Sequence, residues 1–210
     1  MSRTRQTGFS LIEILVVITI IAALVGLATP IIQNALDKGR VVTCSAHLKD
    51  IGQEMFLWKQ RHKDHWPSES GIRFLLVLHR DGQIEGKDNA VFLCPGTNDI
   101  NWIPGESTEP GTAYEDWDTL DSTMISYAGR DNKNYRINKN DENKEVIAAD
   151  DNEFGKNHKY ATNYLYADGS VSTLDIDADV RELGIDLGGL DYVPVGPDSP
   201  IEHFQKLLID

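Results

Sequence analysis

The stretch Gly8-Phe9-Ser10-Leu11-Ile12-Glu13 opens an apolar run that continues as far as Thr29. Glu13 is the only charged residue within this run. At about 1.5 Å per helical residue, a helix from Phe9 to Thr29 is roughly 30 Å long, which matches the hydrocarbon thickness of a bilayer. The pattern therefore predicts a membrane-spanning helix close to the amino terminus.

Two ordinary explanations of such a run account for it less well. A secretory signal peptide has its small-residue cleavage site after the apolar core, whereas Arg3, Arg5 and Gly8 all precede this one. A single-span anchor tolerates these flanks, because Arg3 and Arg5 would hold its amino end in the cytoplasm. It does not explain Glu13, since a lone carboxylate in lipid costs roughly a few kcal/mol and marks a functional site by default.

The join from Thr7 to Glu13 resembles the cleavage and methylation motif of type IV prepilins and type II secretion pseudopilins. The resemblance implies that residues 1–8 are a leader, which a prepilin peptidase removes after Gly8 before methylating the new amino terminus on Phe9. It also implies that Glu13 pairs with the free amine of Phe9 in a neighbouring copy. That pairing would set the register of assembly in a filament.

Length and charge limit the other possibilities. The chain has 210 residues and a formal net charge of −13, which favours one globular domain with appendages. A chain this acidic, with no cluster of lysines and arginines, is not expected to bind nucleic acid. The acids are better suited to solubility or metal binding.

Cys44 and Cys94 are the only two cysteines. If the span places most of the chain outside the cytoplasm, both cysteines meet an oxidising compartment, and a single disulfide is the default prediction. The alternative is two free, buried thiols. No CxxC or Cys/His spacing indicates zinc.

The helix is predicted to continue beyond the span, over residues 30–65. Pro30 should bend it without ending it, because the helical pattern resumes at once, and Pro67 should end it near His65. Apolar residues recur every three or four positions and form one stripe for packing against a domain: Val41, Cys44, Leu48, Ile51, Met55 and Trp58. The segment from Cys44 to Gly52, with Cys94-Pro95 later, resembles a pilin-like subgroup that carries a C-x-x-N-L-x-x-I-G pattern, with His47 in place of Asn.

Residues 66–210 are predicted to form a globular domain of class α+β, in which the long helix packs on a small antiparallel sheet as in pilins. The predicted elements are a helix at Ile72–Leu78, strands at Val91–Leu93, Met124–Ala128, Glu145–Ala149, Tyr164–Ala167 and Ser170–Leu174, and a long loop over 96–121. Asp168-Gly169 predicts a tight two-residue hairpin between the last two strands. The tail, 184–210, is expected to be a flexible strap that ends in a small helix.

Three groups of residues are candidates for chemistry. His158 with Asp168-Gly169 fits an H-x9-DG signature seen in the same pilin-like subgroup, and a structural role is expected for it. Asp175, Asp177 and Asp179 are candidates for a Ca²⁺ site, because calcium prefers hard oxygens, although no EF-hand glycine follows. Trp102 and Trp117 lie in the long loop and could stack on sugars or pin the loop to the domain. No cofactor is expected apart from this possible Ca²⁺.

The prediction is a structural subunit and not an enzyme, because no nucleophile–base or acid-pair spacing is present. As a pilin-like protein it would be anchored in the inner membrane by one span, with its carboxyl-terminal domain outside the cytoplasm. It would then assemble with copies of itself or other pilin-like subunits into a type IV pilus-like filament or a type II secretion pseudopilus. The alternative is a membrane-tethered module that binds carbohydrate or Ca²⁺ at the cell surface.

Overall fold

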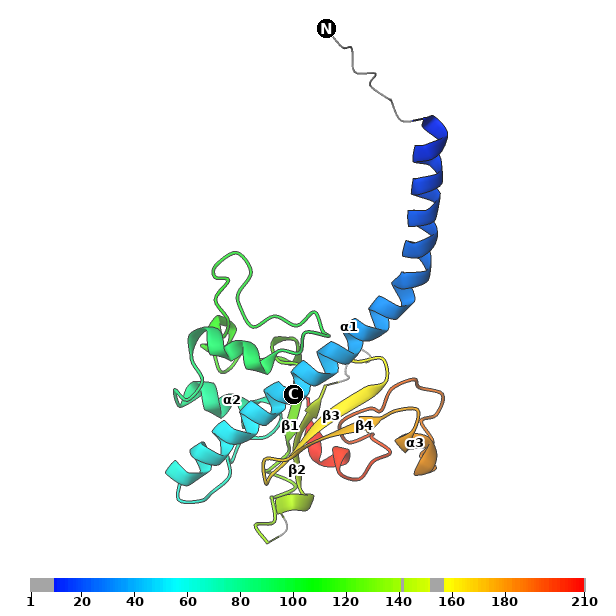
Figure 1. Ribbon diagram of the computed structural model, residues 1–210. Coiled ribbons are helices and arrows are strands. Elements are labelled where there is room, and N and C mark those ends of the chain that lie inside the picture. The colour runs from blue at the N-terminus through cyan, green and yellow to red at the C-terminus, as the bar shows by residue number, and fades with distance from the viewer. Residues whose placement is uncertain (1–9, 141, 152–156, 210) are drawn as a thin grey trace. The chain divides into compact units, whose positions relative to one another are not determined.

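The computed structural model describes residues 10–140, 142–151 and 157–209. The chain forms two compact units, of which the first ends at Lys38 and the second starts at Gly39. Helix α1 (Leu11–Arg61) contributes to both units (Figure 1). The predicted processing residues, Gly8 and Phe9, lie outside the described residues.

Helix α1 has an apolar half without a partner in the described chain. An 18-residue window of it reaches a mean hydropathy of 2.8, and none of that window is buried. By length and composition it is the one helix in the described ranges that could cross a membrane. The helix passes through Pro30 uninterrupted, as predicted. It ends at Arg61, one turn before the predicted end, because Lys63 and Asp64 adopt left-handed φ angles of 55° and 61°.

The second unit is built on a five-stranded antiparallel sheet, which confirms the α+β prediction. The strand order is β4-β3-β2-β1-β5. The strands are β1 (Tyr127–Arg130), β2 (Val146–Asp150), β3 (Ala161–Tyr166), β4 (Val171–Asp175) and β5 (Leu207–Leu208). Every residue of the central strand β2 is buried, so both faces of the sheet are covered.

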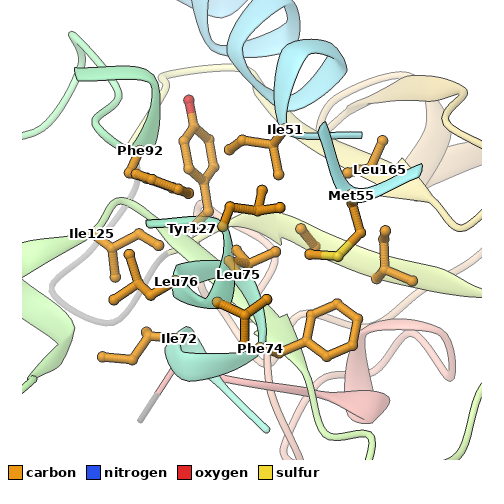
Figure 2. Packing of buried hydrophobic residues seen from close by; sticks show 14 of the residues in the cluster. Ile51, Met55, Ile72, Phe74, Leu75, Leu76, Phe92, Ile125, Tyr127 and Leu165 are labelled. Carbon is orange, nitrogen blue, oxygen red and sulfur yellow. The ribbon is translucent and has the colours of Figure 1, made fainter. Parts of the chain in front are cut away.

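The two faces of the sheet carry two different apolar clusters. One face packs against the carboxyl-terminal half of α1 and against α2 (Ile72–Arg80), with Leu48, Ile51 and Met55 of the predicted stripe fully buried (Figure 2). The other face is covered by the tail, through residues such as Val193 and Phe204. The tail is therefore a packed layer of the domain, and the prediction of a flexible strap is wrong.

The hairpin between β3 and β4 forms where it was predicted. Tyr166 N donates to Ser170 O and Gly169 N donates to Tyr166 O, so the loop has three residues instead of the expected two. Gly169 has a φ of 84°, which favours glycine, and Asp168 Oδ1 accepts from Ser170 N at 2.8 Å. A type I turn closed by a left-handed glycine fits the twist of the flanking strands.

Two short segments differ from the predicted strands. Residues Val91–Leu93 lie at the end of a 3₁₀ helix (Gly86–Phe92). The strand prediction is wrong here because a short apolar run does not distinguish a strand from a buried turn. Leu207 and Leu208, expected on a small helix, form edge strand β5, which pairs with Gly129 and Arg130 after a single 3₁₀ turn at Phe204–Lys206.

Gly129 is where the sheet approaches α2 most closely. A Cβ at this position would collide with the carbonyl oxygen of Gly71, a backbone atom at the start of α2, and would lie 3.3 Å from Leu75 Cγ. Gly129→Ala is therefore expected to lower the free energy of unfolding by about 1–3 kcal/mol, as overpacking does. Urea unfolding checks this. Gly39→Ala is the matched control, because Gly39 lies in α1 with nothing within 4 Å, and it should be stabilising or neutral.

Candidate functional site

The amino-terminal candidate site places Glu13 in the first turn of α1. Its Oε2 accepts a hydrogen bond from Ser10 N at 2.7 Å. This is one half of a capping box, in which a glutamate in the first turn satisfies a backbone N–H just before the helix. Glu13 is the only charged residue from Ser10 to Leu36, so the carboxylate lies at the amino end of a long stretch of α1 that is otherwise uncharged.

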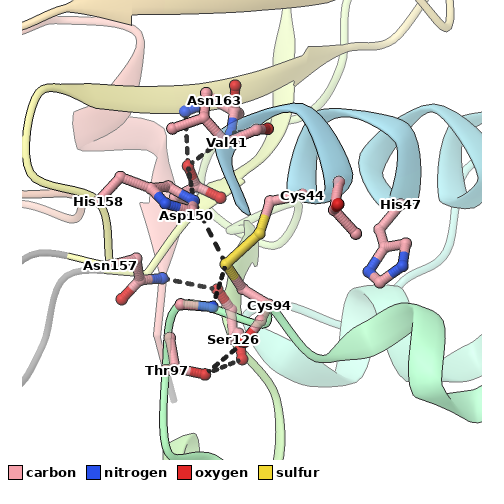
Figure 3. Close-up of a disulfide and its surroundings, with 12 residues drawn as sticks. Val41, Cys44, His47, Cys94, Thr97, Ser126, Asp150, Asn157, His158 and Asn163 are labelled. Atoms are coloured by element: carbon pink, nitrogen blue, oxygen red, sulfur yellow. Dashed lines mark hydrogen bonds and ion pairs between the residues drawn. A yellow bond between two sulfur atoms is a disulfide. The ribbon is translucent and has the colours of Figure 1, made fainter. Parts of the chain in front are cut away.

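The second candidate site is the buried surroundings of the disulfide between Cys44 and Cys94 (Figure 3). The bond links α1 to the segment after the 3₁₀ helix, with the two Cα atoms 5.3 Å apart. It confirms the predicted pairing and leaves no free cysteine. His47, one turn along α1, lies with Nδ1 3.0 Å from Leu93 O, so its ring N–H can donate to that carbonyl.

Asp150, at the end of β2, is fully buried beside this disulfide. Its Oδ2 accepts from the backbone N of Asn163 at 2.7 Å and from the Asn163 side chain at 3.0 Å. Oδ1 is buried and has no hydrogen-bond partner among the described residues. Burial raises the pKa of Asp150 to about 7, against the lowering effect of the Asn163 hydrogen bonds. The sequence did not single out Asp150, because its burial depends on the sheet.

His158 joins Asp150 and the disulfide. Its Nε2 lies 3.3 Å from Cys94 Sγ and 3.7 Å from Asp150 Oδ2, and its side chain is buried. The H-x9-DG residues are not brought together, because β3 separates them: His158 precedes the strand, whereas Asp168 and Gly169 follow it in the hairpin. The spacing of the signature thus corresponds to the length of β3, with His158 before the strand and Asp168-Gly169 after it.

Four side chains at this site could hold a metal ion. Cys44, Cys94, Asp150 and His158 each offer a ligand atom, and these atoms all lie within 4.8 Å of one another.

The predicted Ca²⁺ ligands lie elsewhere, from the end of β4 to the start of α3 (Asp179–Glu182). Asp175 Oδ1 accepts from the backbone N of Asp177 and of Ala178, and Asp179 Oδ2 accepts from Asp175 N. Two of the three carboxylates are therefore hydrogen-bonded to backbone N–H groups just before α3. Ca²⁺ at these aspartates stays a prediction.

The two loop tryptophans lie in different environments. Trp102 lines a cavity of about 590 Å³, together with Ile103, Glu115 and Asp116. Trp117 packs against the main apolar cluster, with the guanidinium carbon of Arg80 5.2 Å from its ring centre. Trp117 therefore pins the loop to the domain, and Trp102 alone is presented to a cavity.

Comparison with known proteins bears on the amino-terminal site. Residues 3–29 match the family model described as the prokaryotic N-terminal methylation motif. Over 76 residues the chain is 29% identical to the type II secretion system core protein G of Pseudomonas aeruginosa. That match covers 36% of this chain and 54% of the relative, so it spans about half of the relative's length. No solved structure matches the chain significantly.

These findings agree with the fold. The matched motif contains Glu13 and leads into the long apolar helix, and the same helix packs its later half on an antiparallel sheet. By its amino-terminal motif and its α+β fold, the chain resembles type IV pilin-like proteins.

Proposed function

We propose that the chain is a structural subunit of a filament. A prepilin peptidase would cleave it after Gly8 and methylate Phe9, and it would then assemble with copies of itself or other pilin-like subunits. The product would be a type IV pilus-like filament or a type II secretion pseudopilus. The methylation motif at residues 3–29 and the similarity to a secretion-system core protein support this function.

Glu13 is the observation on which the proposal mainly rests. A carboxylate in an apolar helix is costly in lipid and needs a partner. Ser10 N satisfies one oxygen of Glu13 in the described chain, but a peptide N–H carries no charge. The amine that cleavage would free on Phe9 of another copy is a cation, and it would neutralise the carboxylate when two helices lie side by side.

The apolar half of α1 also accounts for the location that we propose. It is long and apolar enough to anchor the precursor in the inner membrane as a single span. Arg3 and Arg5 would keep the leader in the cytoplasm, by the positive-inside rule. The globular domain would then lie outside the cytoplasm, where the disulfide between Cys44 and Cys94 can form.

Glu13→Gln tests the charge pairing. Glutamine retains the capping acceptor for Ser10 N but not the charge. We expect normal membrane insertion and normal leader removal with at least a tenfold loss of filament incorporation, measured by shearing and immunoblotting of the sheared fraction. If the variant assembles normally, Glu13 acts only as a helix cap and the pairing is wrong. Gln33→Glu, later in the same helix, is a control for the number of charges and should not restore assembly in the Glu13→Gln background.

Gly8→Val tests processing. A branched side chain before the scissile bond should exclude the chain from the peptidase, so the precursor with its leader should accumulate. Mass spectrometry of protein from its native membrane reports the leader and the added methyl group together. Gly26→Ala is the matched control, because an added Cβ meets nothing within 4 Å there. Normally trimmed Gly8→Val protein would contradict the assignment.

The cavity at Trp102 favours a second candidate function. An aromatic ring beside Glu115, Asp116 and three threonine hydroxyls is a surface on which a sugar could stack and form hydrogen bonds. In this function the pilin-like anchor would carry a carbohydrate-binding domain to the surface. Titration of the full chain with oligosaccharides, followed by Trp102→Ala, tests it; Trp117→Ala, away from the cavity, is the control.

A further inference from the structure

Four metal-binding side chains meet at the disulfide, and each comes from a different part of the chain. Cys44 lies on α1, Cys94 follows the 3₁₀ helix, Asp150 ends β2 and His158 precedes β3. Their exposed fractions are 0%, 2%, 0% and 1%. Sulfur, imidazole nitrogen and carboxylate oxygen are the donors that Zn²⁺ takes in closed, four-coordinate structural sites.

The spacing of these donors suits a tetrahedral ion. Zinc bonds of about 2.0–2.3 Å place neighbouring ligand atoms roughly 3.3–3.8 Å apart. His158 Nε2 already lies 3.3 Å from Cys94 Sγ and 3.7 Å from Asp150 Oδ2. All four ligand atoms lie within 4.8 Å of one another, and the two sulfur atoms must move apart once their bond is broken. We propose that Cys44, Cys94, Asp150 and His158 bind Zn²⁺ when the cysteines are reduced, so that disulfide and metal are alternative occupants of one site.

Asp150 provides an independent reason to expect a ligand. Its Oδ2 is held by two hydrogen bonds from Asn163, whereas the buried Oδ1 has none among the described residues. A buried oxygen without a partner is costly, and native proteins rarely retain one without a reason. A metal ion that Asp150 binds through Oδ1 would remove this cost, and Asn163, which donates to Oδ2, would act as the outer-shell partner that orients the carboxylate.

Electrons and protons balance in the exchange between the disulfide and the metal-bound dithiolate. A dithiol reductant transfers two electrons and two protons to the disulfide, which breaks the S–S bond, leaves thiols on Cys44 and Cys94, and converts the reductant to its own disulfide. Zn²⁺ then displaces the two thiol protons into solvent and binds the two thiolates, the neutral imidazole of His158 and the Asp150 carboxylate. Reoxidation requires the metal to leave, because the disulfide sulfurs no longer carry thiolate charge.

The test uses the full chain in detergent micelles, reduced with a phosphine under anaerobic conditions and titrated with Co²⁺ and then Zn²⁺. Co²⁺ reports tetrahedral thiolate coordination through its intense visible absorption. We expect one equivalent to bind to the reduced chain, and Zn²⁺ to displace it. The oxidised chain should bind at least 100-fold more weakly. Equal binding by the two forms, or no binding by the reduced form, overturns the proposal.

Matched histidine variants distinguish the four-ligand site from nonspecific metal binding by the reduced cysteines of an unfolded chain. His158→Asn should abolish the tetrahedral Co²⁺ spectrum. Its metal affinity should fall by more than the roughly 10–100-fold that the loss of an outer-shell partner costs. His47→Asn should keep both, because His47 contacts Leu93 O and lies outside the four-ligand cluster. A reduced, unfolded chain would respond alike to the two substitutions, so equal responses contradict the site.

A rescue variant covers the case in which His158→Asn does not fold. His158→Cys keeps four donors, and should recover Co²⁺ binding with stronger thiolate-to-metal charge transfer. Asn163→Ala should weaken Zn²⁺ binding by about 10–100-fold without changing the spectrum class. If His158→Cys gives the same spectrum as the unaltered chain, His158 is not a ligand and the proposal is wrong.

Discussion

Replacing Cys44 and Cys94 together with alanine is expected to lower the free energy of unfolding by about 4 kcal/mol. The two residues are 50 positions apart, and the disulfide removes the loop-closure entropy of that segment from the unfolded chain. Domains are stable by only about 5–15 kcal/mol, so the loss is a large share of the total. The loss of stability should appear as unfolding of α1 and of the segment around Cys94 at a lower urea concentration.

Urea unfolding of the full chain in detergent measures this loss, with a chelator present so that no metal compensates for it. The reduced, unaltered chain is the matched control, because it lacks the same bond but keeps both side chains. It should lose nearly as much stability as the double variant. If the oxidised chain and the double variant unfold at the same urea concentration, the disulfide does not stabilise the domain.

A decrease in stability between pH 4 and pH 7 is expected from Asp150. Burial raises its pKa to about 7 in the folded chain, whereas an unfolded aspartate has a pKa of about 3.9. The folded state therefore binds more protons over this interval, and its stability falls as pH rises through it. The difference of roughly three pKa units corresponds to a loss of up to about 4 kcal/mol by pH 7 and above.

Asp150→Asn should remove this loss. The asparagine oxygen can still accept from Asn163, and the side chain carries no charge to bury. Two groups face it: His158 Nε2 lies 3.7 Å from its Oδ2, and the charge of Asp151 also raises its pKa. Unfolding of the oxidised chain at a series of pH values measures the slope. Asp168→Asn, on an exposed turn residue, should leave the slope unchanged, and a flat profile in the unaltered chain would contradict the prediction.

The spacing of apolar residues correctly predicted which side of α1 packs on the domain, because that depends on one helix alone. The stripe on α1 is confirmed, because a residue every three or four positions faces the same side and the domain covers that side. Of its members, Cys44, Leu48, Ile51, Met55 and Trp58 are buried. Once Cys44 was placed on the packed side, its pairing with Cys94 was the simplest use of two cysteines in an oxidising compartment.

The buried cluster could not be predicted in the same way, because its members meet only through the sheet. Asp150 is followed by Asp151 in the sequence, and neighbouring acids are more typical of a solvated surface than of a core. Its burial follows from its place at the end of a central strand that is covered on both faces. Likewise, the absence of a Cys/His spacing typical of zinc says little here, since the four donors come from four separate segments, with 50 positions between Cys44 and Cys94 and a further 64 between Cys94 and His158.

The tail shows the same limit. Ile201, Phe204 and Leu207 recur at helical spacing, but the edge of β1 offered unpaired backbone groups, and pairing with them gave β5. Local spacing cannot reveal a vacant strand edge that forms some 80 residues earlier in the chain.

The position of the disulfide along α1 has a mechanical consequence. Cys44 is the first buried residue of the helix, ahead of Leu48 and all the others that pack on the domain. Tension applied from the amino-terminal end of the helix therefore reaches a covalent bond before it reaches any of the helix's other buried side chains. Such a load would pass into the domain through this bond, and the helix could not peel away one turn at a time until the bond had been reduced.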